Sequence, residues 1–255
     1  MSRLVRSFLG VAVTLVAACG GGTNQSQNSV PASSGAAAPA AAPVTVDTAN
    51  AGTVTGKVTF AGTPPAPTPI KLSSDPYCQK ANPALATETE VVSKDGAVGN
   101  VFVYVKDGLG NQVFPAPSAP VTLDQKGCHY APHVLGIQVG QPLQIINSDD
   151  TLHNVRVSHE ETRASAFNVA IPTGESYTYT FERDGFYRVG CDIHPAMAAS
   201  VFAATTPYTV VAESDGSFTF SDVPTGAWTV TVYTGGKRLH KDVEVKGGVT
   251  EVTID

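Results

Sequence analysis

Short runs of alternating apolar and polar residues recur through most of the chain, and they predict strands. The run Gly52–Phe60 alternates with a period of two, which places every second side chain on one face of a strand. Val101–Val105 is apolar throughout, as expected of a strand buried on both faces. No segment has the pattern of a convincing amphipathic helix. The chain is therefore predicted to be all-β, with further strands at Tyr208–Val211, Ser217–Phe220, Trp228–Tyr233 and Val243–Ile254.

The middle of the chain carries candidate metal chemistry between two predicted strands. Strands are predicted at 185–189 and 198–204, and a further one at 176–181 precedes them. The loop from 190 to 197 offers a thiolate, an imidazole and a thioether at positions i, i+3 and i+6: Cys191, His194 and Met197. Two histidines, one cysteine and a weak methionine make a blue-copper site, and His153 is well placed on another strand to supply the second imidazole.

From about Ala119 to Ala204 the chain resembles a cupredoxin, and its Cys-x2-His-Pro-x-Met loop is similar to that of amicyanins. The segments 127–134, 139–147 and 153–155 match the order of the family. The resemblance implies a Greek-key β-sandwich that holds one type 1 copper ion. It carries over, as copper ligands, His153, Cys191, His194 and Met197.

The same resemblance assigns roles to neighbours of the ligands. It implies that the ring of His194 faces solvent and is the electron exit, while His153 lies deeper. Asn154 corresponds to the asparagine that pins the ligand loop across strands; its alternative role is a simple strand-end turn. Pro195 has no backbone N–H, so we expect the thiolate to accept fewer hydrogen bonds.

The segments on either side of the cupredoxin region resemble one small domain. Asp215–Phe220 together with Val223–Gly226 is similar to the carboxypeptidase regulatory-like, transthyretin-like β-sandwich. That family opens with strands like those at 52–60 and 101–105, which here precede the copper region. We therefore predict a split sandwich, formed by 52–112 and 206–255, around a cupredoxin domain at 113–205. Two independent domains in tandem remain the alternative.

The N-terminal segment predicts export. Residues 1–18 combine two arginines with a short apolar run, as in a signal peptide, and are short of the roughly 20 apolar residues of a membrane span. The sequence Val16–Cys19 resembles a bacterial lipobox, which implies lipidation of Cys19; an ordinary cleavage site is the alternative. Residues 19–51 are rich in Gly, Ser, Ala and Pro and are expected to be a disordered tether. We expect a lipid-anchored protein in the periplasm or at the cell surface, and an outer-membrane location is possible.

The four cysteines divide between three uses. With Cys19 assigned to lipid and Cys191 to copper, Cys78 and Cys128 are left over, and leftover cysteines usually pair in an oxidising compartment. We expect them to form a disulfide in polar, turn-rich surroundings. The alternative is a second metal site with His129 and His133.

Charge and motif content argue against some classes of function. A net charge of −6 without a run of Lys or Arg argues against nucleic acid as a partner. No triad, phosphate loop or His-x-His pair supports an enzyme, and Asp149 and Asp150 are interpreted as a turn. His159 and His240 are expected to be solvated, and Trp228 to lie in a core.

The leading hypothesis is a type 1 copper electron carrier that serves a c-type cytochrome or a membrane-side oxidoreductase. A copper storage protein and a surface interaction protein without a redox partner are the alternatives.

Overall fold

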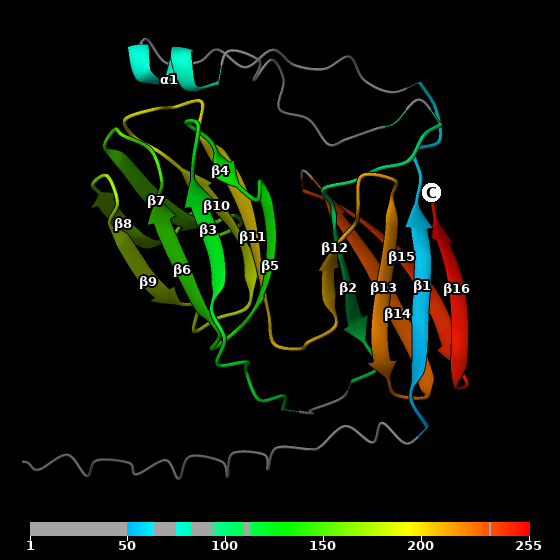
Figure 1. Ribbon diagram of the computed structural model, residues 1–255. Coiled ribbons are helices and arrows are strands. Elements are labelled where there is room, and N and C mark those ends of the chain that lie inside the picture. The colour runs from blue at the N-terminus through cyan, green and yellow to red at the C-terminus, as the bar shows by residue number, and fades with distance from the viewer. Residues whose placement is uncertain (1–49, 64–74, 83–92, 94, 110–112, 235) are drawn as a thin grey trace, which may run out of the picture. The chain divides into compact units, whose positions relative to one another are not determined.

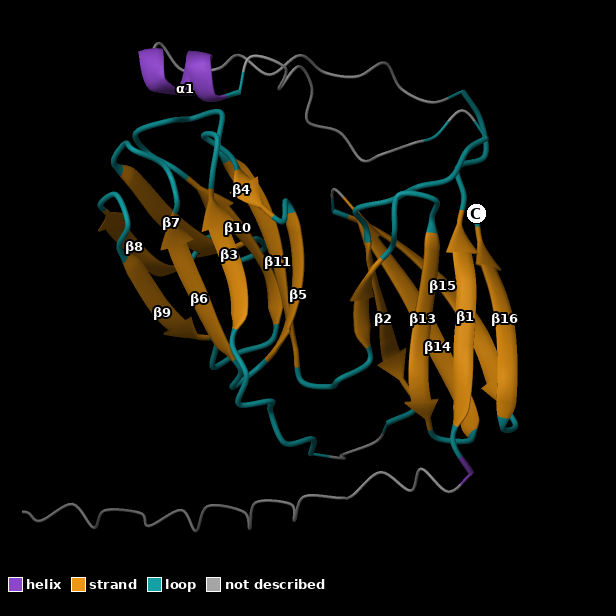
Figure 2. Ribbon diagram, viewed as in Figure 1, coloured by secondary structure: helices purple, strands orange, loops and turns teal. Residues whose placement is uncertain are grey.

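Strands make up nearly all of the regular structure (Figure 1, Figure 2). The structure, a computed structural model, describes residues 50–63, 75–82, 93, 95–109, 113–234 and 236–255. The predicted signal peptide, Cys19 and the predicted tether up to residue 49 lie outside these ranges. Within them, one α-helix occurs, α1 (Pro76–Ala81), and no helix is long and apolar enough to cross a bilayer. The all-β prediction is confirmed.

Residues 121 to 204 form two sheets that face each other across one core. The first has the strand order β4-β3-β6-β9 and the second β5-β11-β10-β7-β8, and each contains a parallel pair, β3 with β6 and β5 with β11. The strands are β3 (Val121–Gln125), β4 (Tyr130–Ala131), β5 (Val134–Gln138), β6 (Pro142–Asn147), β7 (His153–His159), β8 (Ser165–Ile171), β9 (Ser176–Thr180), β10 (Gly185–Gly190) and β11 (Ala198–Ala204).

Alternation of side chains explains how these strands build the core. Leu123, Leu143 and Ile145 point inward from the first sheet, and Val155 and Val157 from the second, all fully buried. The short segment 181–184 between β9 and β10 joins strands of different sheets, because β9 pairs with β6 while β10 pairs with β7 and β11.

The remaining strands form a second pair of sheets. Their orders are β13-β1-β16 and β12-β2-β14-β15, so strands from before and after the first sandwich lie in the same sheets. The core between them contains Val54, Val103, Phe220 and Trp228. The strands are β1 (Gly52–Val58), β2 (Phe102–Asp107), β12 (Thr209–Val211), β13 (Ser217–Val223), β14 (Gly226–Thr234), β15 (Lys237–Val245) and β16 (Gly248–Ile254).

The structure contains the disulfide between Cys78 and Cys128. Cys78 lies in α1, where no helix was predicted, and Cys128 lies between β3 and β4. Both cysteines are buried, so the bridge does not lie at the surface, although Cys128 does stand in a bend. In the chain-entropy model a link across about 50 residues contributes about 4 kcal/mol of stability.

Substitution of Gly56 tests how closely β1 packs against β13 and β16. A Cβ on Gly56 would lie 2.2 Å from the carbonyl oxygen of Val252 in β16 and 2.7 Å from the ring of Phe218 in β13. We expect Gly56→Ala to lower the free energy of unfolding by about 1–3 kcal/mol, the usual cost of overpacking. Denaturant unfolding followed by Trp228, the only tryptophan and a member of this core, measures the change.

Lys57→Ala is the matched control on the same strand. The ammonium group of Lys57 is exposed and lies 3.9 Å from Asp215. Its removal should therefore change the free energy of unfolding by less than about 0.5 kcal/mol. Equal unfolding midpoints for the Gly56 and Lys57 variants would contradict the close packing of β1.

Candidate metal centre

Two histidines and a cysteine converge at one end of the first sandwich. His153 begins β7, whereas Cys191 and His194 lie in the loop that joins β10 to β11. Their donor atoms lie within 4.8 Å of one another, and all three residues are buried. The structure therefore brings together three of the four residues predicted as ligands.

Strand geometry directs His153 toward the loop. His153 lies on the same face of β7 as Val155 and Val157, because side chains alternate along a strand, and this face is the core face. Gly190 at the end of β10 pairs with Arg156 in β7, so residue 153 lies just beyond the end of β10, beside the ligand loop.

Three hydrogen bonds fold the ligand loop. The N–H of Cys191 donates to the carbonyl of Met197 at 3.2 Å, and the N–H of Met197 donates to the carbonyl of His194 at 2.9 Å. The N–H of His194 donates to the sulfur of Cys191 at 3.3 Å. Gly190 and Ala198 pair at the base of the loop, so a short segment is closed at both ends.

The nitrogens of the two imidazoles indicate a cation between them. Nδ1 of His153 and Nδ1 of His194 are 3.0 Å apart, and Sγ of Cys191 is 3.8 Å from the latter. The Nε2 atom of each ring lies at a carboxylate, which can only accept a hydrogen bond when ionised, so each Nε2 carries the proton. Both Nδ1 atoms then present lone pairs to each other. A shared proton or a metal ion between them would relieve this contact, and imidazole bonds of about 2 Å to one ion fit the separation.

The carboxylate that contacts His153 is that of Asp149, a residue interpreted from the sequence as part of a simple turn. Its Oδ2 accepts from Nε2 of His153 at 2.9 Å and from the N–H of Cys128 at 2.8 Å, while Oδ1 accepts from the N–H of Gly127 at 2.6 Å. Asn147 holds the segment, because its Oδ1 accepts from the N–H of Asp149 at 3.0 Å. Asp149 is thus a buried partner of a predicted ligand.

Burial and hydrogen bonding oppose each other at this pair. Burial alone would raise the pKa of Asp149, but the N–H of Cys128 and the ring of His153 hold that pKa below its usual value. Burial lowers the pKa of His153, against the opposing effect of Asp149. The pair therefore favours an ionised carboxylate beside a neutral imidazole, the form in which histidine binds metals.

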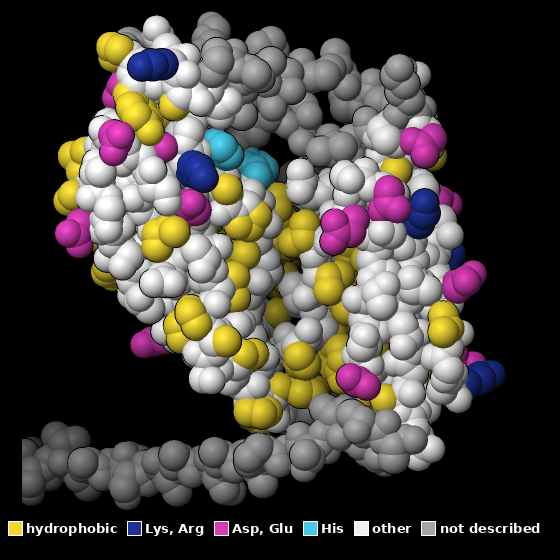
Figure 3. Space-filling model, viewed as in Figure 1, with side chains coloured by type: hydrophobic (Ala, Val, Ile, Leu, Met, Phe, Trp, Pro, Cys, Tyr) yellow, Lys and Arg dark blue, Asp and Glu magenta, His cyan; other side chains and the backbone are white. Residues whose placement is uncertain are grey.

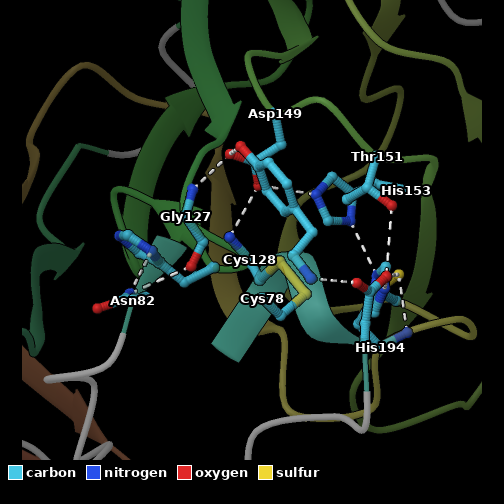
Figure 4. The surroundings of a disulfide bond; sticks show 12 residues. Cys78, Asn82, Gly127, Cys128, Asp149, Thr151, His153 and His194 are labelled. Atoms are coloured by element: carbon cyan, nitrogen blue, oxygen red, sulfur yellow. Dashed lines mark hydrogen bonds and ion pairs between the residues drawn. A yellow bond between two sulfur atoms is a disulfide. The ribbon is translucent and has the colours of Figure 1, made fainter. Parts of the chain in front are cut away.

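The surroundings of His194 contradict the expected solvent-facing ring. His194 is only 2% exposed, and its Nε2 lies 3.0 Å from Oδ2 of Asp75, the N-cap residue of α1. The hydrogen bond from His194 lowers the pKa of Asp75. Figure 4 shows His153 and His194 joined by a dashed line, near the Cys78–Cys128 disulfide. No local pattern signals this contact, since the two residues lie 119 positions apart in the chain.

Asn154 makes the contacts expected of a residue that pins the ligand loop. Its Oδ1 accepts from the N–H of Asp192 at 2.9 Å, and its Nδ2 donates to the carbonyl of Val169 in β8 at 3.3 Å. The N–H of Asn154 also donates to the sulfur of Cys191 at 3.4 Å. With the N–H of His194, the sulfur therefore accepts two backbone hydrogen bonds, although Pro195 can supply none.

The remaining residues that the sequence analysis singled out lie outside the three-residue donor group. Met197 is 1% exposed, packed in the core at the end of the ligand loop, and Pro195 is exposed. His133 bonds through Nδ1 to the carbonyl of Ala198 at 2.9 Å, and His129 lies beside Asn82. Because Cys78 and Cys128 are bonded to each other, they are not thiolate ligands for these histidines.

Comparison with known proteins agrees with this architecture. Residues 118–203 match the family described as copper binding proteins, plastocyanin/azurin family. No curated protein matches the chain. Residues 118–203 therefore form a cupredoxin domain, and the match to a copper-binding family includes the strand that carries His153 and the loop that carries Cys191 and His194.

Several solved structures are similar to part of the chain. A copper-containing nitrite reductase from Thermus scotoductus is 27% identical over 36% of this chain, with a TM-score of 0.31, and this chain covers 25% of that protein. A Cu(I) methionine-to-alanine mutant of amicyanin is 23% identical over 34% of this chain and 84% of its own, with a TM-score of 0.31. A purple cupredoxin from Nitrosopumilus maritimus is 23% identical over 33% of this chain and 99% of its own, with a TM-score of 0.30.

The role of Asn154 in holding the loop can be measured directly. Asn154→Ala removes the acceptor of the Asp192 N–H, and one such hydrogen bond contributes about 1 kcal/mol. Exchange of the Asp192 amide hydrogen in the metal-free protein should therefore become about fivefold faster, as measured by NMR. Arg156→Ala is the control, because it removes an exposed ion pair to the side chain of Asp192 and leaves the N–H bonded. Equal exchange rates in the two variants would refute the pinning role.

Proposed function

We propose that this protein is a lipid-anchored electron carrier with one type 1 copper ion. The observation that carries the proposal is the pair of Nδ1 atoms 3.0 Å apart, beside a free buried thiol, with both Nε2 atoms engaged by carboxylates. Two imidazoles and a thiolate in a buried site are the donor set of a blue-copper centre. The match of residues 118–203 to a copper-binding family supports the same conclusion.

The chain's residues would take distinct roles at this centre. His153, Cys191 and His194 would hold the ion, and Met197, buried on the same loop, is proposed as a weaker fourth ligand. Bound copper supplies a one-electron couple between Cu(I) and Cu(II). The two N–H groups that donate to the Cys191 sulfur would fix its orientation as a ligand, and Cys191 itself is buried. A preformed, buried site favours a carrier because its donors need little movement.

The proposed partner is a redox protein, such as a c-type cytochrome or a membrane-side oxidoreductase. Two large exposed apolar residues directly precede ligand histidines: Leu152 is 45% exposed and Ile193 is 44% exposed. Charged side chains are scattered over the face seen in Figure 3, whereas the whole chain is acidic. A small apolar contact beside the site, with long-range attraction to a basic partner, suits brief docking.

The anchor and the location stay proposals from the sequence. Lipidation at Cys19, followed by a tether, would place the carrier at a bacterial membrane surface in the periplasm or outside the cell. A copper storage protein or a surface interaction protein is the alternative function. Among the described residues, every candidate donor group contains His153 or His194, so the donors gather at one place. This favours a carrier over storage, because a storage protein would use repeated Met or His motifs.

Direct coordination by Cys191 predicts an intensely coloured oxidised protein. With Cu(II) bound, wild type should show a strong thiolate-to-copper absorption band and narrow hyperfine splitting in EPR. Cys191→Ala should lose both features, because the sulfur supplies the transition. Met197→Gln is the matched variant, since it keeps the thiolate and both imidazoles and should keep the colour while lowering the reduction potential. A coloured Cys191→Ala protein would refute the assignment.

Electron exchange should depend on the apolar contact beside the site. Exchange with a basic cytochrome c, followed by stopped-flow, should slow as salt rises, because screening weakens the attraction. Ile193→Ser should weaken docking about tenfold, since burial of an isoleucine contributes about 1.5 kcal/mol.

Val249→Ser provides the control for this experiment. Val249 is 68% exposed but lies in β16 of the other sandwich, so its replacement should leave the rate unchanged. If the exchange rate changes neither with salt nor on replacing Ile193 by serine, the proposal of electron transfer through this surface is wrong. Storage then becomes the better explanation.

A further inference from the structure

Residues 75–82, here called the cap, are fastened over the proposed copper ligands. The cap contains α1 and is joined to the sandwich covalently by the Cys78–Cys128 disulfide. The hydroxyl of Tyr77 donates to Oδ1 of Asp149 at 3.1 Å, and Nδ2 of Asn82 donates to the carbonyl of Gly127 at 3.2 Å. These three attachments fix the cap along its length (Figure 4).

Asp75, the first residue of the cap, places its carboxylate beside Nε2 of His194. Oδ1 of Asp75 accepts from the N–H of Tyr77 at 2.7 Å, so the start of α1 orients the side chain. Oδ2 accepts from Nε2 of His194 at 3.0 Å and from Oγ1 of Thr151 at 3.4 Å. As a result a ring that sits at the end of the sandwich is 2% exposed.

Asp75 therefore repeats, for His194, the arrangement that Asp149 makes for His153. Both carboxylates bind an outer Nε2, at 3.0 Å and 2.9 Å, and both leave Nδ1 directed at the other histidine. The two carboxylates belong to different segments: Asp149 is part of the sandwich, whereas Asp75 is part of the cap. The disulfide between Cys78 and Cys128 connects the two, since Cys128 donates its N–H to Asp149.

We propose that Asp75 is a positioning residue for the metal centre, and that the Cys78–Cys128 disulfide holds it against His194. The inference rests on the proposed function in taking His194 as a ligand. A carboxylate that accepts from Nε2 fixes the tautomer and the orientation of the ring and strengthens Nδ1 as a donor. Its negative charge favours the more highly charged state of a bound metal ion.

The first test replaces Asp75 by serine. Serine is about as good an N-cap as aspartate, so Asp75→Ser keeps the start of α1. Its hydroxyl cannot reach both the Tyr77 N–H and the His194 ring. Asp150→Ser is the matched control: it removes one negative charge next to Asp149, and the Asp150 side chain is exposed.

We expect Asp75→Ser to weaken Cu(II) and Zn²⁺ binding about 10- to 100-fold in chelator competition, the usual loss for such a partner of a ligand. The reduction potential of the copper protein should rise, because Cu(II) loses a nearby anion. In the metal-free protein, the ¹⁵N NMR signals of His194 should show loss of the fixed Nε2–H tautomer. Asp150→Ser should change none of these readouts. Equal affinities, potentials and tautomers in the two variants would overturn the proposal.

The second test asks whether the disulfide acts through Asp75. Replacing both Cys78 and Cys128 by serine should weaken metal binding by the same factor as Asp75→Ser, and combining all three changes should add little further loss. Independent, multiplying losses, or no loss in the disulfide variant, would show that the disulfide does not hold Asp75. If the disulfide variant fails to fold, Asp75→Ser alone decides the positioning role.

These outcomes separate the inference from the proposed function. A wild-type protein with the thiolate-to-copper band and an Asp75→Ser variant of unchanged affinity would refute only the positioning role. A wild-type protein without that band would refute the blue-copper assignment. The Zn²⁺ affinity and the metal-free NMR signals would then still measure what Asp75 does to His194.

Discussion

The arrangement of the candidate site depends on one constraint: two imidazoles whose outer nitrogens are each bound to a carboxylate. Once Asp75 and Asp149 accept from the Nε2 atoms, the Nδ1 lone pairs of His194 and His153 have to face one another at 3.0 Å. Such a contact is unfavourable without a positive charge between the rings. The surrounding hydrogen bonds of the 147–153 segment and the ligand loop keep the rings from turning away. The arrangement of the two rings is therefore suited to a cation at this point.

The sandwich supplies the rigidity that this constraint needs. β7 aims His153 with the same alternation that buries Val155 and Val157, and the paired ends of β10 and β11 hold the loop that carries Cys191. Asn154 adds a cross-connection from β7 to the loop and to β8. Because each donor group is fixed by the regular sheet or by a short bonded loop, little of the site's geometry depends on long flexible segments.

The sequence was sufficient for features that depend on local pattern. Period-two alternation predicted the strands, and the spacing of Cys191, His194 and Met197 in a short loop predicted a soft-ligand site. Two features were missed because they depend on contacts between distant segments. Asp149 has the sequence context of a turn, and only burial and the approach of Gly127 and Cys128 make it a partner of His153. The helix α1 spans six residues, too few for a periodic signal, so neither the cap nor the burial of His194 could be predicted.

The pairing of β1 has a consequence for how the chain is made. β1 lies between β13 and β16, with Val58 opposite Ile254 at the other end of the sequence. The second sandwich cannot close until β16 has been made, whereas all strands of the cupredoxin domain are complete by Ala204. A cupredoxin domain that folds first would draw the two halves of the second sandwich together and reduce the entropy lost on closing so long a loop. Assembly would then begin with residues 121–204, and the pairing of β1 with β13 and β16 would follow.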